Sequence, residues 1–269
     1  MSTADTLLEA AQTALILGGV AALWRFGLRA EARRTPAALA AWDASLTDFF
    51  LFLWLVVCSG LIVPFAVSPW LKHAVITPDF RLILGTAAFQ CGLLAGVIAF
   101  RFGFSRRARP APAVVARVNP LLAGAATYLA ALPVIVAVSI IWQGLLKLCH
   151  IPAPPQEAVD VLRHAKAGLP ITLLLISAII IAPISEELIF RAGISRYVRT
   201  RLPRWAALLL PAFVFGAMHA NLSSFAPLVA LGLVFSLAYE RTGRISTTIV
   251  AHAIFNLTST LLVMAGVDV

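Results

Sequence analysis

Eight apolar stretches, each long enough to cross a bilayer, constrain this chain more than any other feature. An α-helix needs about 20 apolar residues to span the hydrocarbon core, and its backbone polar groups are then satisfied internally. The sequence therefore predicts an all-α fold, a polytopic integral membrane bundle of about eight transmembrane helices with no room for a soluble domain. The stretches cover residues 6–28, 49–71, 82–102, 120–147, 168–190, 204–220, 222–240 and 245–266.

The sixth and seventh stretches are close to the lower length limit and are joined at Asn221. We expect them to form either a tight helical hairpin or a partly re-entrant pair, because a helix much shorter than the bilayer cannot span it alone.

The positions of the basic residues indicate whether the chain binds nucleic acid or a bilayer, and how it is oriented in the membrane. A net charge of +9 could suggest nucleic acid, but Lys and Arg lie in short loops between the apolar stretches. Cytoplasmic loops carry an excess of these residues. The connections after the first, third, fifth and seventh stretches hold 16 of them and the other side holds 5. We therefore predict the lipid bilayer as a partner and no nucleic acid, with both termini on the non-cytoplasmic side. The Ala- and Arg-rich composition favours a bacterial cytoplasmic (inner) membrane.

Ionisable side chains inside a membrane are costly, so each one is a candidate functional residue. Among the acids, only Glu186 and Glu187 follow directly on an apolar run, and among the histidines only His219 and His252 fall within predicted spans. All four lie in the last four predicted helices. The sequence therefore predicts one site in this part of the chain.

The spacing of these residues organises the site, because residues four apart on a helix share a face. Arg191 lies four residues after Glu187 and can keep that carboxylate charged, which leaves Glu186 to exchange a proton. Two further pairs have the same spacing, and they are Phe215 with His219 and His252 with Asn256.

Such residues suit the hydrolysis of a peptide bond. Glu186 could act as the base that activates water, His219 could orient that water, and His252 with Asn256 could donate to the oxyanion. Each feature also has a purely structural explanation, because a buried His or Asn often joins two membrane helices and a Glu–Arg pair often stabilises an interface. Three pairs in one third of the chain favour a catalytic site, with Glu187, Arg191 and Phe215 in supporting roles.

The three pairs, in this order, resemble the motifs of the CAAX-protease and bacteriocin-processing membrane peptidases, also called the Abi or type II CAAX endopeptidase family. They read EELIFR from Glu186, FGAMH up to His219, and HAIFN from His252. The resemblance covers about residues 170–260. It implies an all-helical intramembrane endopeptidase in which Glu186 activates water, His219 assists, and His252 and Asn256 form the oxyanion hole.

We accordingly expect a single membrane domain over 1–269 with its catalytic core in 166–262, and we assign no role to the N-terminal helices in 1–165. The expected partner is a membrane-associated protein or peptide substrate. The sequence does not choose among particular substrates.

The resemblance leaves open whether the site holds a metal ion, because members of that family have been described both as metalloproteases and as metal-free glutamate proteases. Glu186, His219 and His252 could supply three zinc ligands, but the chain has no H-E-x-x-H motif. We expect no cofactor, with zinc at these three residues as the alternative.

Two other functions compete with peptidase activity. Buried Glu and His could relay protons in a proton-coupled transporter, but the first four predicted helices hold hardly any buried ionisable groups for a pathway. A non-catalytic peptide-binding or immunity membrane protein is the other alternative, and the intact motif residues argue against it.

Overall fold

The protein is helical throughout the part of the chain that the computed structural model describes. That part comprises residues 3–34, 39, 42–74, 76–104, 118–154, 157–164 and 168–267, and every regular element in it is a helix. The chain divides into two compact units. Unit 1 comprises residues 1–39, 114–156 and 208–251, and unit 2 comprises 40–113, 157–207 and 252–269.

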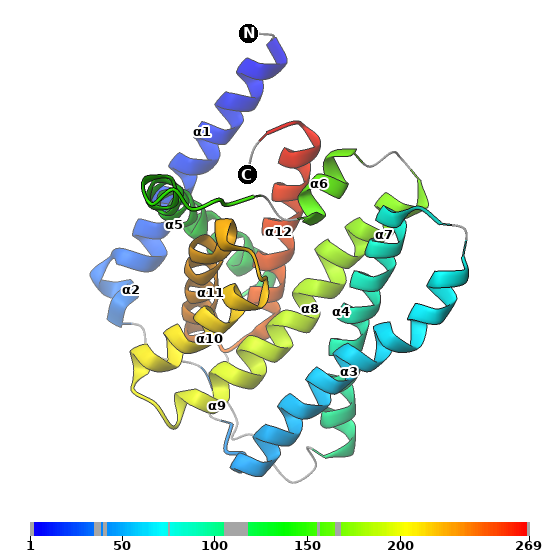
Figure 1. The fold of residues 1–269 in the computed structure, drawn as a ribbon. Coiled ribbons are helices and arrows are strands. Elements are labelled where there is room, and N and C mark those ends of the chain that lie inside the picture. The colour runs from blue at the N-terminus through cyan, green and yellow to red at the C-terminus, as the bar shows by residue number, and fades with distance from the viewer. Residues whose placement is uncertain are drawn as a thin grey trace. The chain divides into compact units, whose positions relative to one another are not determined.

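Unit 1 is built around a long helix that contacts two others, since α5 packs against α1 and α11 (Figure 1). Helix α5 begins with a cap, because the side chain of Asn119 accepts a hydrogen bond from the Leu121 amide and Pro120 occupies the first turn. The helices of this unit are α1 (Thr3–Leu23), η1 (Trp24–Leu28), α2 (Ala30–Arg34), α5 (Pro120–Leu148), α10 (Arg204–Met218) from residue 208, α11 (Leu222–Thr242) and the first part of α12 (Ile245–Met264).

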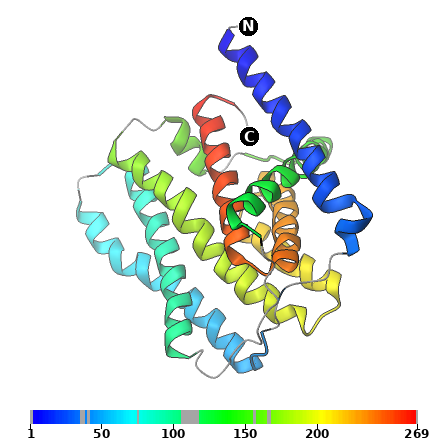
Figure 2. The same ribbon diagram turned by 180° about the vertical axis from the view of Figure 1, so that it is seen from behind.

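Unit 2 contains a helical hairpin, α3 and α4, and one long helix that runs from Leu169 to Arg199 beside α4 (Figures 1 and 2). Two π-helical segments interrupt the long helix, one on each side of the adjacent glutamates. The elements are α3 (Leu46–His73), α4 (Pro78–Gly103), α6 (Glu157–His164), α7 (Leu169–Ile176), η3 (Ser177–Ile181), α8 (Ala182–Glu187), η4 (Leu188–Ser195), α9 (Arg196–Arg199) and α12 from residue 252.

Helices α3 and α4 cross very closely because α4 carries glycines at the crossing. A Cβ atom at Gly96 would lie 2.6 Å from the Leu55 carbonyl oxygen, and one at Gly92 would lie 3.0 Å from the Gly60 Cα. Small residues let the two backbones approach each other. Such close van der Waals packing helps to hold membrane helices together, because the hydrophobic effect does not drive helices together inside a bilayer. The crossing fixes the position of α4 within unit 2, and α4 contributes a side chain to the site described below.

The membrane-spanning pattern is close to the one predicted. Seven described helices are long and apolar enough to span: Glu9–Leu28, Leu46–His73, Pro78–Gly103, Pro120–Leu148, Leu169–Arg199, Leu222–Thr242 and Ile245–Met264. The predicted sixth stretch forms α10, which has 15 residues. At 1.5 Å per residue it is about 22 Å long, shorter than the roughly 30 Å hydrocarbon core. The all-α, multi-pass integral membrane fold is therefore confirmed, with seven candidate spans in the described chain where about eight were predicted.

Candidate active site

The two adjacent glutamates are positioned by the long helix of unit 2, whose local geometry follows from Pro183. In the π-helical segment before it, the Ala182 amide donates to the Ser177 carbonyl, five residues back. In the same five-residue pattern, the next hydrogen bond would join the amide of residue 183 to the Ala178 carbonyl, but proline has no N–H. The Ala178 carbonyl therefore lacks a backbone donor within the helix. π-helical turns of this kind are frequent at functional sites.

Asn256 on α12 takes up the released carbonyl. Its Nδ2 donates to the Ala178 oxygen at 2.7 Å. This bond fixes the orientation of the amide and leaves a second N–H on Nδ2 that can donate elsewhere. It also ties α12 to the long helix two turns before Glu186.

Glu187 lies at the centre of a buried charged cluster. Its Oε1 accepts from Nη1 of Arg191 at 2.8 Å and lies 3.0 Å from Nδ1 of His252. The side chains of Glu187, Arg191 and His252 are 0%, 1% and 4% exposed. The predicted Glu187–Arg191 pair is thus present, and His252 joins it from another helix. Because an ionised carboxylate only accepts hydrogen bonds, Nδ1 of His252 carries the proton in this contact.

Glu186 has different surroundings, although it is the next residue. Its Oε1 accepts from Nε2 of Gln90 at 3.0 Å, and its Oε2 lies 3.8 Å from Nε2 of His252. The side chain is 12% exposed. Of the two glutamates, Glu186 is therefore the one that accepts from a neutral donor and whose side chain is partly exposed.

Residues 168–258 match a protein family described as Type II CAAX prenyl endopeptidase Rce1-like. The predicted family resemblance is confirmed for these residues. The Rce1-like region thus contains Glu186, Glu187, Arg191, His219, His252 and Asn256.

Curated relatives are similar to part of the chain. A Bacillus subtilis (strain 168) protein named "Putative membrane peptidase YdiL" is 35% identical over 86 residues, which is 32% of this chain and 35% of the relative. An Escherichia coli protein named "Uncharacterized 24.3 kDa protein" is 29% identical over 43% of this chain and 56% of its own length. The "UPF0177 protein YbdI" of Lactococcus lactis subsp. lactis (strain IL1403) is 31% identical over 33% and 48%. The chain therefore spans about a third to a half of these relatives, and no solved structure matches it significantly.

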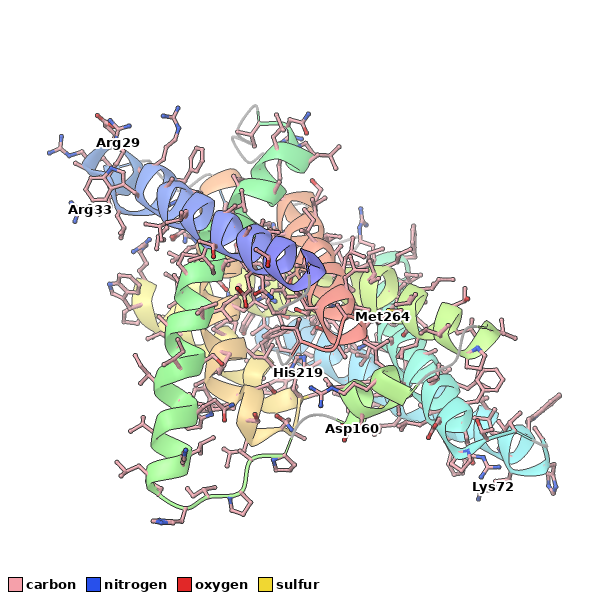
Figure 3. The ribbon with its side chains drawn as sticks, turned by 90° about the horizontal axis from the view of Figure 1, so that it is seen from above. Arg29, Arg33, Lys72, Asp160, His219 and Met264 are labelled. Atoms are coloured by element: carbon pink, nitrogen blue, oxygen red, sulfur yellow. The ribbon has the colours of Figure 1, made fainter. Side chains whose placement is uncertain are left out.

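The first histidine of the Rce1-like region, His219, belongs to unit 1 and follows directly on α10 (Figure 3). Its Nδ1 lies 2.8 Å from the carbonyl oxygen of Phe215, and the two rings are in edge contact with centroids 4.9 Å apart. Because a carbonyl only accepts, Nδ1 donates here and Nε2 keeps its lone pair when the ring is neutral. The predicted Phe215–His219 pair is thus present, and its geometry defines the tautomer of the imidazole.

The turn after His219 is held by Asn221. Its Oδ1 accepts from the amide and the hydroxyl of Ser224, both at 2.9 Å, and its Nδ2 donates to the Pro154 carbonyl at 3.1 Å. Ala220, between His219 and Asn221, has a φ of 48°, a left-handed backbone conformation that is uncommon for alanine. Asn221 thus caps α11 and also joins the turn to residues after α5.

We expect Asn221→Ala to lower the melting temperature, because it removes a helix cap worth about 1 kcal/mol together with the bond to Pro154. Asn119→Ala is the matched control, since Asn119 caps α5 through a single bond to Leu121. Thermal unfolding in detergent should show the larger decrease for Asn221→Ala. An equal or smaller decrease would contradict the second role of Asn221.

Gln90 is the site residue that the sequence analysis missed. It is the only amide in the apolar stretch 82–102, and the averaged hydropathy of that stretch hides it. A search for single polar side chains within spans would have found it, because such groups usually find a partner on another helix.

The zinc alternative requires three ligands close together. Within the described ranges, no three His, Cys, Asp or Glu residues are grouped so that they could hold a metal ion. The expectation of a metal-free site stays a prediction, which a chelator can test directly.

Proposed function

We propose that this chain is an intramembrane endopeptidase that hydrolyses a peptide bond of a membrane-associated protein or peptide. The observation that carries the proposal is the contrast between Glu186 and Glu187. Glu187 is enclosed and bonded to Arg191 and His252, whereas Glu186 is partly exposed and bonded to the neutral Gln90. Paired carboxylates in different environments are how many hydrolases separate a group that exchanges protons from one that stays charged.

In this proposal Glu186 is the general base. Its Oε2 takes a proton from water while the water oxygen attacks the carbonyl carbon of the substrate, which forms a tetrahedral intermediate. Glu186 then returns the proton to the departing amine as the C–N bond breaks. The products are a new carboxyl group and a new amino terminus, so no co-reactant other than water is needed.

His252 and Asn256 would stabilise the oxyanion. Nδ1 of His252 donates to Glu187, so its Nε2 can donate to the oxyanion when both ring nitrogens carry a proton. Asn256 contributes the N–H that is not used by Ala178. Donors fixed before the reaction are the arrangement that lowers the barrier to acyl transfer most strongly.

His219 takes its role from the family resemblance, as the partner that positions water. Its bond to the Phe215 carbonyl supports that role, because the remaining nitrogen, Nε2, is then an acceptor. We assign Phe215 and Arg191 to supporting roles, since they hold His219 and Glu187 respectively.

The similarity to membrane peptidases supports the proposed reaction class, and the apolar helices support a reaction at or within the membrane. We further propose that the protein lies in a bacterial cytoplasmic membrane. Both termini would lie on the non-cytoplasmic side, because every second loop along the chain is rich in Lys and Arg, as cytoplasmic loops are. The substrate would then reach the site from the bilayer or its surface.

Cleavage of a panel of membrane-tethered peptides by the purified protein tests the proposal. We expect cleavage by the wild type, with or without a strong zinc chelator, and strongly reduced cleavage by Glu186→Gln, His219→Ala and His252→Ala. Loss of activity on chelation, with recovery when zinc is added back, would favour zinc at Glu186, His219 and His252. Equal cleavage by wild type and Glu186→Gln would show that another residue is the base.

A further inference from the structure

Gln90 reaches the Glu186 carboxylate from α4, a helix outside the Rce1-like region. Its amide makes two side-chain bonds to the long helix. Nε2 donates to Glu186 Oε1 at 3.0 Å, and Oε1 accepts from the Ser185 hydroxyl at 2.6 Å. One amide thus joins two consecutive residues of the helix that carries the proposed base.

Ser185 and the Glu186 carboxylate together determine which way the amide faces. The Ser185 hydroxyl is fully buried and lies 2.6 Å from Gln90 Oε1 and 3.1 Å from the Ala182 carbonyl, and it has one proton to donate. The shorter contact is with Gln90. The reverse orientation of the amide would place its oxygen against the Glu186 carboxylate, two acceptors without a proton between them. The Glu186 carboxylate therefore favours the orientation in which Nε2 faces it, and the Ser185 hydroxyl stabilises that orientation by donating to Oε1.

The two oxygens of Glu186 consequently have separate partners. Oε1 is held by Gln90, while Oε2 lies on the side of His252, 3.8 Å from its Nε2. We infer that Gln90 is a positioning residue, which Ser185 orients and which holds Glu186 through Oε1 so that Oε2 is available for the proton of the attacking water. This inference rests on the proposed function of Glu186 as the base.

The other charged groups near Glu186 make their hydrogen bonds elsewhere, although Nε2 of His252 lies 3.8 Å from Glu186 Oε2. Glu187 and Arg191 come from the same helix and bond to each other, and His252 comes from α12 and bonds to Glu187. Gln90 is thus the neutral donor that contacts Glu186 itself. A hydrogen bond from an N–H group to a carboxylate oxygen is charge-assisted and directional, so Gln90 can hold the Glu186 side chain in one orientation.

A double-mutant cycle on kcat tests the positioning role. Gln90→Met keeps the length of the side chain but removes both bonds, and we expect kcat to fall about 10- to 100-fold with little change in KM, because small displacements of a reacting group have effects of this size. Ser185→Ala should reduce kcat less, since the amide can still reach Glu186. Because Ser185 acts through Gln90, the double variant should be no slower than Gln90→Met alone.

Thr127→Val is the control for the loss of a polar side chain in a membrane helix. Thr127 lies on α5, and its hydroxyl donates to the Ala123 carbonyl of the same helix. It should leave kcat unchanged. Fully additive losses for Gln90→Met and Ser185→Ala, or an unchanged kcat in Gln90→Met, would overturn the inference.

A chemical probe gives a second readout that does not need cleavage. Dicyclohexylcarbodiimide reacts with protonated carboxyl groups in apolar surroundings, and mass spectrometry can locate the adduct. We expect Glu186 to be modified faster in Gln90→Met than in the wild type, because its Oε1 is then no longer held by the Gln90 amide, with Thr127→Val matching the wild type. If no peptide is cleaved but this difference is present, the proposed function fails and the hydrogen-bonded arrangement stands. Equal modification rates would overturn the role of Gln90 itself.

Discussion

Replacing Glu186 by glutamine should reduce kcat about a thousandfold and leave the protein folded. General base catalysis contributes roughly 10²- to 10⁴-fold, and an amide cannot take a proton from water. Stability should change little because Gln90 still finds an oxygen to donate to, and the side chain is partly exposed. Rates of peptide cleavage and melting temperatures in the same detergent test both parts of the expectation.

The adjacent residue provides the matched control for this substitution. Glu187→Gln makes the same chemical change one position along the helix, in a fully enclosed environment. If Glu186 and Glu187 have the proposed roles, the first substitution affects catalysis alone and the second affects stability as well. A large stability loss in Glu186→Gln, with activity per folded molecule preserved, would reverse the assignment.

Glu187→Gln should destabilise the protein by about 3–5 kcal/mol, the usual cost of removing one partner of a buried ion pair. The Arg191 guanidinium is 1% exposed and loses the carboxylate that accepts from it at 2.8 Å. Equilibrium unfolding in mixed micelles or thermal unfolding in detergent measures the change. A loss below 1 kcal/mol would show that the pair does not contribute substantially to the fold.

Removing the charge of Arg191 as well should restore much of this stability. The double variant Glu187→Gln, Arg191→Met has no unpaired buried charge, and buried pairs can often be replaced by neutral groups at little cost. Activity should stay low, because the carboxylate that accepts from Nδ1 of His252 and orients its ring is absent. Recovery of stability without recovery of activity would separate the two roles of Glu187.

The helical membrane fold could be predicted because long apolar stretches report directly on the bilayer. Helix ends were less accurate. Helices α3 and α4 begin at residues 46 and 78, where hydropathy predicted 49 and 82. The extra turns contain polar residues and are started by the caps Ser45 and Thr77, whose side chains accept from backbone amides. Hydropathy does not detect caps, and it also does not detect that α10 ends before His219.

Much of the chemistry of the site could be predicted because it depends on spacing within helices. The pairs Glu187–Arg191 and Phe215–His219 follow from the four-residue repeat, and both are present. The contacts of His252 with the glutamates depend on tertiary packing, which spacing along one helix does not define. The same is true of Gln90, which lies about 95 residues before its partners.

Pro183 shows how sequence and tertiary structure combine. It lies three residues before Glu186 and removes one backbone N–H from the helix. The structure has a π-helical segment there, and the carbonyl that lacks an amide partner is bonded by Asn256. The missing N–H was evident from the sequence, but the helix that compensates for it was not.

Single-turnover cleavage of a tethered peptide in H₂¹⁸O, by protein treated with a zinc chelator, tests whether Glu186 activates water for peptide hydrolysis without a metal. We expect an undiminished rate, one ¹⁸O atom in the new carboxyl group of the product, and no label in Glu186. Label in the Glu186 carboxylate would indicate that it attacks the substrate itself, and a rate that returns only with added zinc would indicate a metal-bound water. With either result, Glu186 would not be the base of a metal-free reaction.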